Sequence, residues 1–364
     1  MKRHNRLKKH TLGLAALLVT AGMSQIALAG DSVYVNTSSL RYRTSAQIKD
    51  NNIAGNLSYG QKLERVGTSG QWTMILLNGK KYYVSSAYVT SKKPASAGAV
   101  QTTSQTAAGA QTSGGTAIAL SSNYKYANYS KINSGTATLY RSTASNKKNK
   151  VVCVNAGHGT NGGGSVKTQC HPDGTAKVTG GTTGAGATSA VAVSTGMTFS
   201  DGTAESKVTL AMAKVLKDKL LSAGYDVLMI RDGEDVQLDN IARSVIANNA
   251  ADCHIALHWD STTSNKGAFY MSVPDVASYK NMEPVKSHWQ QHNALGASLV
   301  EGLKSAGVKI FSGGSMAMDL TQTSYSTVPS VDIELGDKAS DHSQSTLNQL
   351  GDGLVAGVKA YFGQ

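Results

Sequence analysis

Hydrophobic positions in residues 149–364 follow two patterns that alternate along the chain. One is a set of short, nearly continuous apolar runs, which are typical of buried strands. These runs are 150–156, 225–231, 252–260, 266–273 and 330–335. The other pattern repeats about every 3.6 residues, as in amphipathic helices. It occupies 204–224, 237–250, 288–307 and 347–362. Alternating strands and helices predict an α/β domain with a mixed sheet flanked by helices.

Residues 30–92 show a different pattern, in which short alternating stretches are separated by turn residues. The stretch 32–43 alternates apolar and polar residues, and Asn78–Gly79 lies between two apolar runs, as in a two-residue β-hairpin. About sixty residues of this kind predict a small all-β barrel that is separate from the α/β domain.

Between these regions, residues 94–122 contain no charged or aromatic residue and are rich in Ala, Ser, Thr, Gly and Gln. Such a composition offers no core, so we expect a flexible linker over 93–148, and a random coil of some 27 residues of this kind reaches roughly 30 Å. Residues 124–150 are rich in Tyr and Lys. This part either extends the linker or packs on the domain that follows it.

The first 29 residues have the three parts of an export signal: a basic head, an apolar core and the small-residue exit Ala27-Leu28-Ala29. The apolar core is too short to span a bilayer. We therefore expect a signal peptide at 1–29, a secreted, wall-associated protein, and no membrane span in the mature chain. The oligomeric state is not indicated.

Charge and cysteine content add two expectations. Removing the five Lys and Arg residues of the signal lowers the formal charge from +12 to +7. On an exported protein this excess favours an anionic cell wall as partner and argues against nucleic acid, although a basic surface also serves solubility. The chain has three cysteines, Cys153, Cys170 and Cys253, so at least one of them is unpaired or pairs between chains. Cys153 and Cys253 could bond if their strands are neighbours, and no spacing of a thiolate zinc site is present.

Four polar residues lie where the predicted sheet presents its ligand-binding edge. His158 follows the first strand, His258 ends the third, Glu334 ends the last, and Glu205 begins a helix. In open α/β sheets, ligands bind at the carboxyl ends of the strands. Two imidazoles and one carboxylate form a common catalytic zinc set, and a further carboxylate can move protons. The glycines around His158 allow backbone and substrate to approach closely.

Other histidines compete for a metal role. On a strand, His254 and His258 are separated by about 13 Å, too far to share one metal. His288 and His292 would share a helix face, but Trp289 occupies the position of the zincin general base. His171 and His342 are interpreted as loop residues.

The blocks 151–159, 204–231, 235–261 and 325–337 resemble, in order, those of the zinc-dependent N-acetylmuramoyl-L-alanine amidases of the Amidase_3 type. The resemblance implies a Zn²⁺ ion held by His158, Glu205 and His258, with Glu334 as the catalytic carboxylate. It also implies cleavage of the amide between N-acetylmuramic acid and L-alanine in peptidoglycan. Arg231 and Arg243 match family arginines and are interpreted as structural ion-pair or strand-end residues. Substrate-binding residues are not indicated.

Residues 30–92 are similar to bacterial SH3-like modules, which dock wall hydrolases on peptidoglycan. The similarity lies in 38–46, in 59–67, at Trp72 and in 80–89. The alternative is a barrel that does not bind the wall and acts only as a spacer or a stabilising unit.

The sequence departs from the amidase pattern in three places. Asn155-Ala156 replaces the usual Asp-Pro, which removes an acidic residue that could orient His158. The segment 161–203 is long and rich in Gly, Thr and Ser, and is either a substrate-shaping loop, a lid or a tolerated insertion. The residues after Glu334 also differ from those of the family.

The sequence thus predicts a secreted amidase domain at 149–364 with a wall-binding module at 30–92. Two alternatives remain open at this point. One is a zinc peptidase that cuts within the stem peptide, and the other is a catalytically inactive wall-binding protein.

Overall fold

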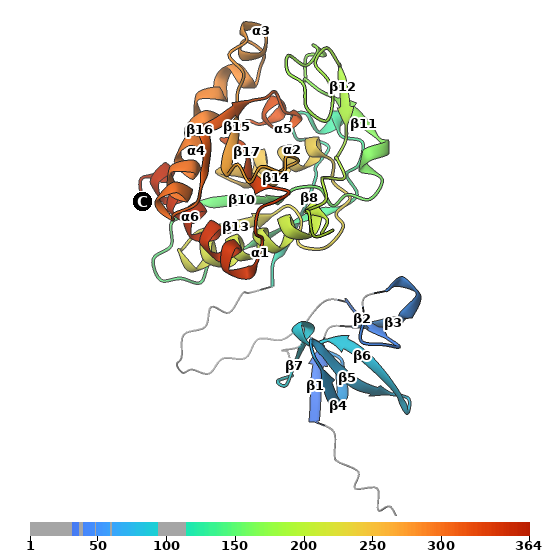
Figure 1. Ribbon diagram of the computed structural model, residues 1–364. Coiled ribbons are helices and arrows are strands. Elements are labelled where there is room, and N and C mark those ends of the chain that lie inside the picture. The colour runs from blue at the N-terminus through green and yellow to red at the C-terminus, as the bar shows by residue number, and fades with distance from the viewer. Residues whose placement is uncertain (1–30, 36–38, 48, 59, 94–113) are drawn as a thin grey trace, which may run out of the picture. The chain divides into compact units, whose positions relative to one another are not determined.

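The computed structural model describes residues 31–35, 39–47, 49–58, 60–93 and 114–364 (Figure 1). The chain divides into two compact units, residues 1–104 and 105–364. The predicted signal peptide lies outside the described residues. No helix among those described is both long and apolar enough to cross a bilayer.

The N-terminal unit is an antiparallel sheet with strand order β3-β2-β6-β5-β4-β1-β7. Its inward side chains form a small apolar core that includes Val35, Leu63 and Ile75. The predicted hairpin at Asn78–Gly79 is confirmed, since β5 and β6 pair directly across it and both turn residues have positive φ. The strands are β1 (Asp31–Val35), β2 (Ser39–Arg43), β3 (Ile53–Ser58), β4 (Lys62–Ser69), β5 (Trp72–Leu77), β6 (Lys80–Ser85) and β7 (Val89–Thr90), with short 3₁₀ turns η1 (Asp50–Asn52) and η2 (Ser86–Tyr88).

The second unit contains an eight-stranded sheet with the order β16-β15-β17-β14-β10-β13-β9-β8. The neighbours β13, β10, β14 and β17 are parallel, whereas β9 and β15 run antiparallel to β13 and β17. This confirms the predicted α/β class with a mixed sheet. The strands are β8 (Thr116–Ala119), β9 (Thr136–Tyr140), β10 (Val151–Ala156), β13 (Asp226–Met229), β14 (Cys253–Asp260), β15 (Ala268–Ser272), β16 (Ile310–Ala317) and β17 (Ser330–Asp337).

Strands β8 and β9 lie within the segment predicted to be linker, so the linker prediction is wrong for the described residues 114–148. Between these strands, the 3₁₀ turn η3 (Ala127–Tyr129) precedes a segment anchored to the second unit. The buried carboxylate of Asp239 accepts hydrogen bonds from the Ser130 hydroxyl and from the backbone of Lys131 and Ile132. The folded unit therefore begins well before residue 149.

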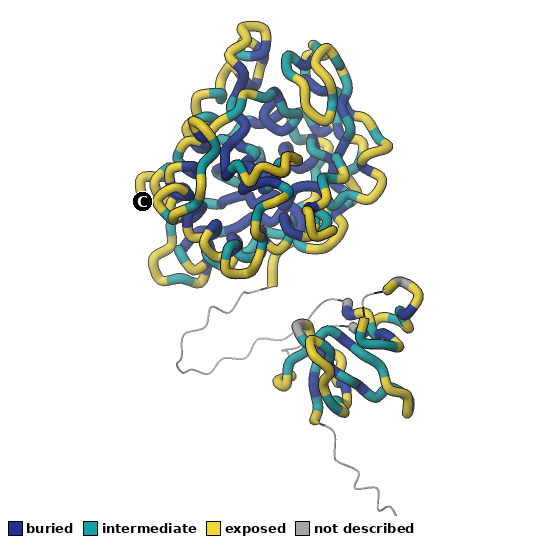
Figure 2. The backbone as a smooth tube through the Cα atoms, in the orientation of Figure 1, coloured by how far each residue is buried: buried dark blue, intermediate teal, exposed yellow. Residues whose placement is uncertain are grey.

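One face of the central strands is apolar because alternate side chains point to the same side of a pleated sheet. Val154 on β10, Ile255 on β14 and Ile333 on β17 belong to this buried core. Figure 2 shows the central strands of this unit largely in the dark blue of buried residues. Helices α1 (Glu205–Ser222), α4 (Val285–Ser305) and α6 (Gln344–Phe362) supply many of the other apolar side chains of that core.

The opposite face is apolar toward β13, where α2 (Asn240–Ala250) packs, and polar along β14 and β17. Two shorter helices, α3 (Ala277–Lys280) and α5 (Thr321–Tyr325), complete the helical part. The residues 153, 155, 254, 256, 258, 330, 332 and 334 alternate with the apolar set, and most of them are polar. The pleat therefore collects polar side chains over adjacent strands.

The same alternation separates two cysteines. Strands β10 and β14 are neighbours, as a Cys153–Cys253 bond would require, but the two thiols belong to apolar clusters on opposite faces of the sheet. All three cysteines are buried and free.

Candidate metal centre

His158, Glu205 and His258 converge at the carboxyl edge of the sheet. His158 follows β10, Glu205 is the first residue of α1, and His258 lies near the end of β14. The His158 Nε2 and Glu205 Oε1 atoms are 2.9 Å apart, and His258 Nδ1 lies 3.0 Å from the first and 3.2 Å from the second. Three potential ligand atoms thus face one point, and this is a possible metal site.

The glycines beside His158 have separate tasks. His158 itself has a positive φ of 64°, so the chain turns sharply after β10. A Cβ atom at Gly157 would lie 2.5 Å from His258 Nε2, and one at Gly159 would lie 2.5 Å from Arg231 Nε. Side chains on either side of His158 would therefore displace a ring of the cluster or the guanidinium beneath the turn.

Backbone groups of residues 194–197 orient two members of the cluster. The His158 Nδ1–H donates to the Ser194 carbonyl at 2.8 Å, which leaves Nε2 free to face the other ligands. The Met197 N–H donates to Glu205 Oε2 at 2.8 Å, while the Trp259 N–H donates to Oε1 at 3.1 Å. The orienting partner missing from the sequence pattern is thus supplied by the 161–203 segment.

Electrostatics in the cluster favour an ionised carboxylate and a charged ring when no metal is bound. Burial would raise the pKa of Glu205, but hydrogen bonds from His158 and His258 outweigh it and hold that pKa far below its usual range. Burial lowers the pKa of His258, but Asp332, Glu205 and Glu334 raise it to about 10. A divalent cation bound here would replace the proton of the charged His258 ring and balance the negative charge of the carboxylates.

Glu334 lies beside His258 in the register of β14 and β17 and faces the same cavity. It is only 8% exposed, and its Oε2 atom has no hydrogen-bond partner among the described residues. Burial, reinforced by Asp332, raises the pKa of Glu334 well above its ordinary value. A raised pKa suits a carboxyl group that both takes up and gives back a proton.

The cavity over these residues has a volume of about 440 Å³. Much of one wall comes from the 161–203 segment, which contains β11 (Lys167–Gln169), β12 (Ser189–Val191) and the turn η4 (Gly163–Ser165). Lys177 of this segment is buried against Asp319, whose carboxylate also accepts from the Val178 N–H and the Thr179 hydroxyl. The segment is therefore anchored in place as part of the cavity wall.

Arg231 and Arg243 hold the turn that carries His158, mainly through backbone carbonyl groups. Arg231 donates to the Gly157 carbonyl at 3.0 Å, and Arg243 donates to the His158 carbonyl at 2.7 Å. The predicted structural role fits these contacts, but the partners are carbonyl groups and not the carboxylates of ion pairs. Arg243 also donates to the Asn155 side chain, which donates in turn to His254 Nε2.

The competing histidines do not join the cluster. His254 is buried between Asn155 and Ser330, and its pKa is lowered to about 3, chiefly by burial. His288 and His292 share a face of α4, but His292 Nδ1 accepts from the Ser330 N–H. Among the described residues, the only set of three or more potential ligands is His158, Glu205 and His258.

His171 and His342 lie in loops, as predicted, with other partners. His171 lies 3.2 Å from the Asp319 carboxylate, and His342 lies 3.3 Å from that of Asp201. Asp332, in contrast, was not singled out from the sequence, although it lines the cavity. Strand alternation could have identified Asp332, because it lies two residues before Glu334 and its side chain therefore points to the same face of the sheet.

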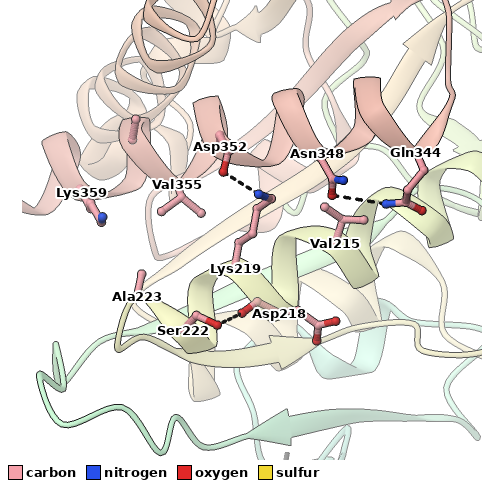
Figure 3. A pocket seen from close by; sticks show the side chains of 11 residues that line it. Val215, Asp218, Lys219, Ser222, Ala223, Gln344, Asn348, Asp352, Val355 and Lys359 are labelled. Atoms are coloured by element: carbon pink, nitrogen blue, oxygen red, sulfur yellow. Dashed lines mark hydrogen bonds and ion pairs between the residues drawn. The ribbon is translucent and has the colours of Figure 1, made fainter. Parts of the chain in front are cut away.

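A second hollow lies between α1 and α6, away from the cluster (Figure 3). Lys219 crosses it to reach Asp352 at 2.5 Å, and Val215 and Val355 supply apolar lining. It contains no histidine or cysteine. We assign it no chemistry.

Comparison with known proteins identifies the family. The sequence model of the Amidase_3 family, described as N-acetylmuramoyl-L-alanine amidase, matches residues 152–358. No curated protein matches the chain.

Similar solved structures include the N-acetylmuramyl-L-alanine amidase Ami1 from Mycobacterium smegmatis, with 16% identity, a TM-score of 0.49, and coverage of 60% of this chain and 99% of that one. The apo form of Ami1 from Mycobacterium abscessus has 19% identity, a TM-score of 0.46, and coverage of 58% and 98%. The amidase AmiC2 of Nostoc punctiforme has 16% identity, a TM-score of 0.42, and coverage of 60% and 99%. Because the family match spans more than half of the 364 residues, the chain belongs to the Amidase_3 family of N-acetylmuramoyl-L-alanine amidases.

Proposed function

We propose that the protein is a secreted, zinc-dependent amidase of peptidoglycan. It cleaves the amide between the lactyl group of N-acetylmuramic acid and the L-alanine of the stem peptide. Family membership supports this reaction. The single observation that carries the metal assignment is the convergence of His158, Glu205 and His258, the first two of them buried.

The donor set of this cluster fits zinc. Its three ligand atoms are 2.9–3.2 Å apart, close to the roughly 3.3 Å expected between ligands of a tetrahedral site with bonds of about 2.0–2.1 Å. Three protein ligands leave a fourth position open, as in catalytic zinc sites. A bound zinc ion would lower the pKa of water and polarise the carbonyl oxygen of the amide.

Glu334 acts in this proposal as the group that moves the proton. Its side chain projects from β17 next to His258, and its Oε2 atom is free of protein partners within the described residues. The carboxylate takes a proton from the attacking water and passes it to the departing L-alanine nitrogen as the C–N bond breaks. The contacts of Ser194 and Met197 keep His158 and Glu205 fixed during this transfer.

The N-terminal unit serves, we infer, as an SH3-like module that docks on the wall. Residues 31–93 contain nine Lys and Arg residues and three Asp and Glu residues. This positive excess suits an anionic wall polymer. Export through the predicted signal at 1–29 would deliver the enzyme to that substrate.

The decisive experiment is mass spectrometry of products released from purified sacculi, with and without a chelator. Amidase action yields stem peptides with free L-alanine amines and glycan with uncut lactyl carboxylates. Termini within the stem peptide would instead identify a peptidase. Stoichiometric zinc without any product would identify an inactive wall-binding protein. Digestion that persists after complete metal removal would exclude the zinc assignment.

The role of the N-terminal unit is tested separately by deletion of residues 31–93. We expect unchanged turnover of a soluble muropeptide and weaker binding to sacculi. Equal binding by the full chain and the deletion variant would contradict the docking role.

A further inference from the structure

Asp332 is an acidic residue of the cavity that the mechanism above does not use. It belongs to β17, two residues before Glu334, and its side chain is 15% exposed. We propose that Asp332 is a positioning residue for His258, whose ring N–H it accepts when the opposite ring nitrogen binds the metal. This inference rests on the proposed metal site.

Strand register brings the two residues to the same face. Asp332 pairs with Ala256 on β14, and Glu334 pairs with His258, so all four side chains share one side of the sheet. Ala256 has only a methyl group, and Asp332 therefore has no large neighbour directly across from it. Its Oδ2 atom lies 3.8 Å from His258 Nε2.

The two edges of the His258 ring face different surroundings. Nδ1 points to His158 and Glu205, at 3.0 and 3.2 Å. Nε2 points away from these ligands, and no hydrogen bond to it is formed within the part of the chain that the structure describes. The backbone of Gly157 packs against this edge, so the ring has little room to turn. Asp332 is the carboxylate within ion-pair distance of that nitrogen.

Asp332 in turn lacks another partner. Its Oδ1 atom is buried without a hydrogen bond among the described residues, and its one ion pair there is with His258. A buried carboxylate is costly unless a charged or donating group compensates it. The separation of 3.8 Å exceeds the usual 2.7–3.2 Å of an N–H···O bond by about 0.6 Å. A small rotation of the Asp332 side chain closes that gap.

A ligand role for Asp332 itself is less favourable. The cluster of atoms that can share one ion consists of His158, Glu205 and His258, without Asp332, in the described chain. A carboxylate behind a metal-binding histidine fixes which ring nitrogen carries the proton and makes the other a better donor. Here it would keep the proton on Nε2 and leave Nδ1 for the metal.

The test compares Asp332→Asn and Asp332→Ala with the wild type and with Asp352→Asn. The control carries the same substitution on α6, where the carboxylate pairs with Lys219 at the surface. Zinc affinity is measured by chelator competition, and thermal unfolding is followed with and without zinc. We expect zinc binding to weaken about 10- to 100-fold in Asp332→Ala and less in Asp332→Asn. The control should bind zinc as the wild type does.

Metal-free stability separates positioning from a structural role. Because Asp332 faces the His258 ring at 3.8 Å before any zinc binds, the variants should lose a little stability without zinc and clearly more with it, so that the stabilisation by zinc shrinks. Zinc binding within twofold of wild type in both variants would overturn the inference, as would a loss of stability in Asp332→Asn that is equal with and without zinc. A wild-type chain that binds no zinc would refute the proposed metal site, and this inference with it.

Discussion

The imidazole of His258 packs directly against the backbone of Gly157, so that a methyl group there would lie 2.5 Å from Nε2. Gly157→Ala should therefore push the ring out of the cluster and weaken zinc binding on the order of 100-fold or more, since even indirect changes at such sites cost about 10- to 100-fold. Gly184→Ala is the matched control, because nothing lies within 4 Å of a Cβ there. Chelator competition on both variants measures the effect, and equal affinities would contradict it.

Loss of the Glu334 carboxylate should separate metal binding from turnover. Glu334→Gln and Glu334→Ala leave the three cluster residues in place, so zinc content should remain that of the wild type. Turnover should fall by roughly 10²- to 10⁴-fold, the usual contribution of a general acid–base group. Glu301→Gln, an exposed change on α4, controls for the substitution. Digestion of sacculi by Glu334→Ala at the wild-type rate would refute the assignment.

Zinc uptake should release protons near neutral pH. The pKa of metal-free His258 is about 10, so the ring is charged at pH 7, and its Nδ1 must be available before it can bind a cation. The pKa of Glu205 lies far below its usual range, and this carboxylate adds no proton. We expect about one proton per zinc ion, and an apparent affinity that rises up to tenfold per pH unit between about 6 and 9. Calorimetry in two buffers of different ionisation enthalpy counts the protons; heats independent of the buffer would contradict this.

Acid should destabilise the metal-free fold through two buried histidines. Burial lowers the pKa of His254 and of His292 to about 3, whereas the unfolded value is near 6.5. Between these values the unfolded state binds more protons, so the free energy of unfolding falls as pH decreases, by about 1.4 kcal/mol per pH unit for each histidine. Each contribution is fully present above about pH 6.5.

His292→Gln isolates one of these contributions. The free energy of unfolding is measured with urea in the presence of a chelator at pH 7, 6 and 5. Below the unfolded pKa, its slope against pH should be smaller in the variant than in the wild type by about 1.4 kcal/mol per pH unit. The range stays above the region where carboxylates titrate in the unfolded chain. Identical slopes for the variant and the wild type would show that His292 takes up its proton as readily in the folded state as in the unfolded state, and would contradict this prediction.

The amidase fold could be predicted because its central strands are buried on both faces and read as apolar runs. The three cluster residues could be found because they are polar and fall at strand ends or a helix start. Their roles in zinc binding and catalysis stay predictions. Strand β8 is not predicted because an edge strand buries few side chains, so Thr116–Ala119 resembles the linker before it in composition. Strand β9 lies between β13 and β8, but only Ala137 of its five residues is buried, so it forms no apolar run.

Other features depend on contacts that no periodic pattern encodes. The carbonyl group of Ser194 reaches His158 from a segment rich in Gly, Thr and Ser, and a backbone contact of this kind leaves no mark on residue type. Asp332 was visible in principle, since alternation placed it on the face of Glu334. The SH3-like character of the N-terminal unit stays a prediction beside its observed antiparallel sheet.

The stretch from Lys177 to Met197 lines the cavity and also forms hydrogen bonds to His158 and Glu205. Insertions or deletions there would reshape the space for a glycopeptide and change cation affinity in the same step. Relatives with a different length in this stretch must therefore secure the histidine and the glutamate by another route, and substrate preference and metal retention are expected to diversify together.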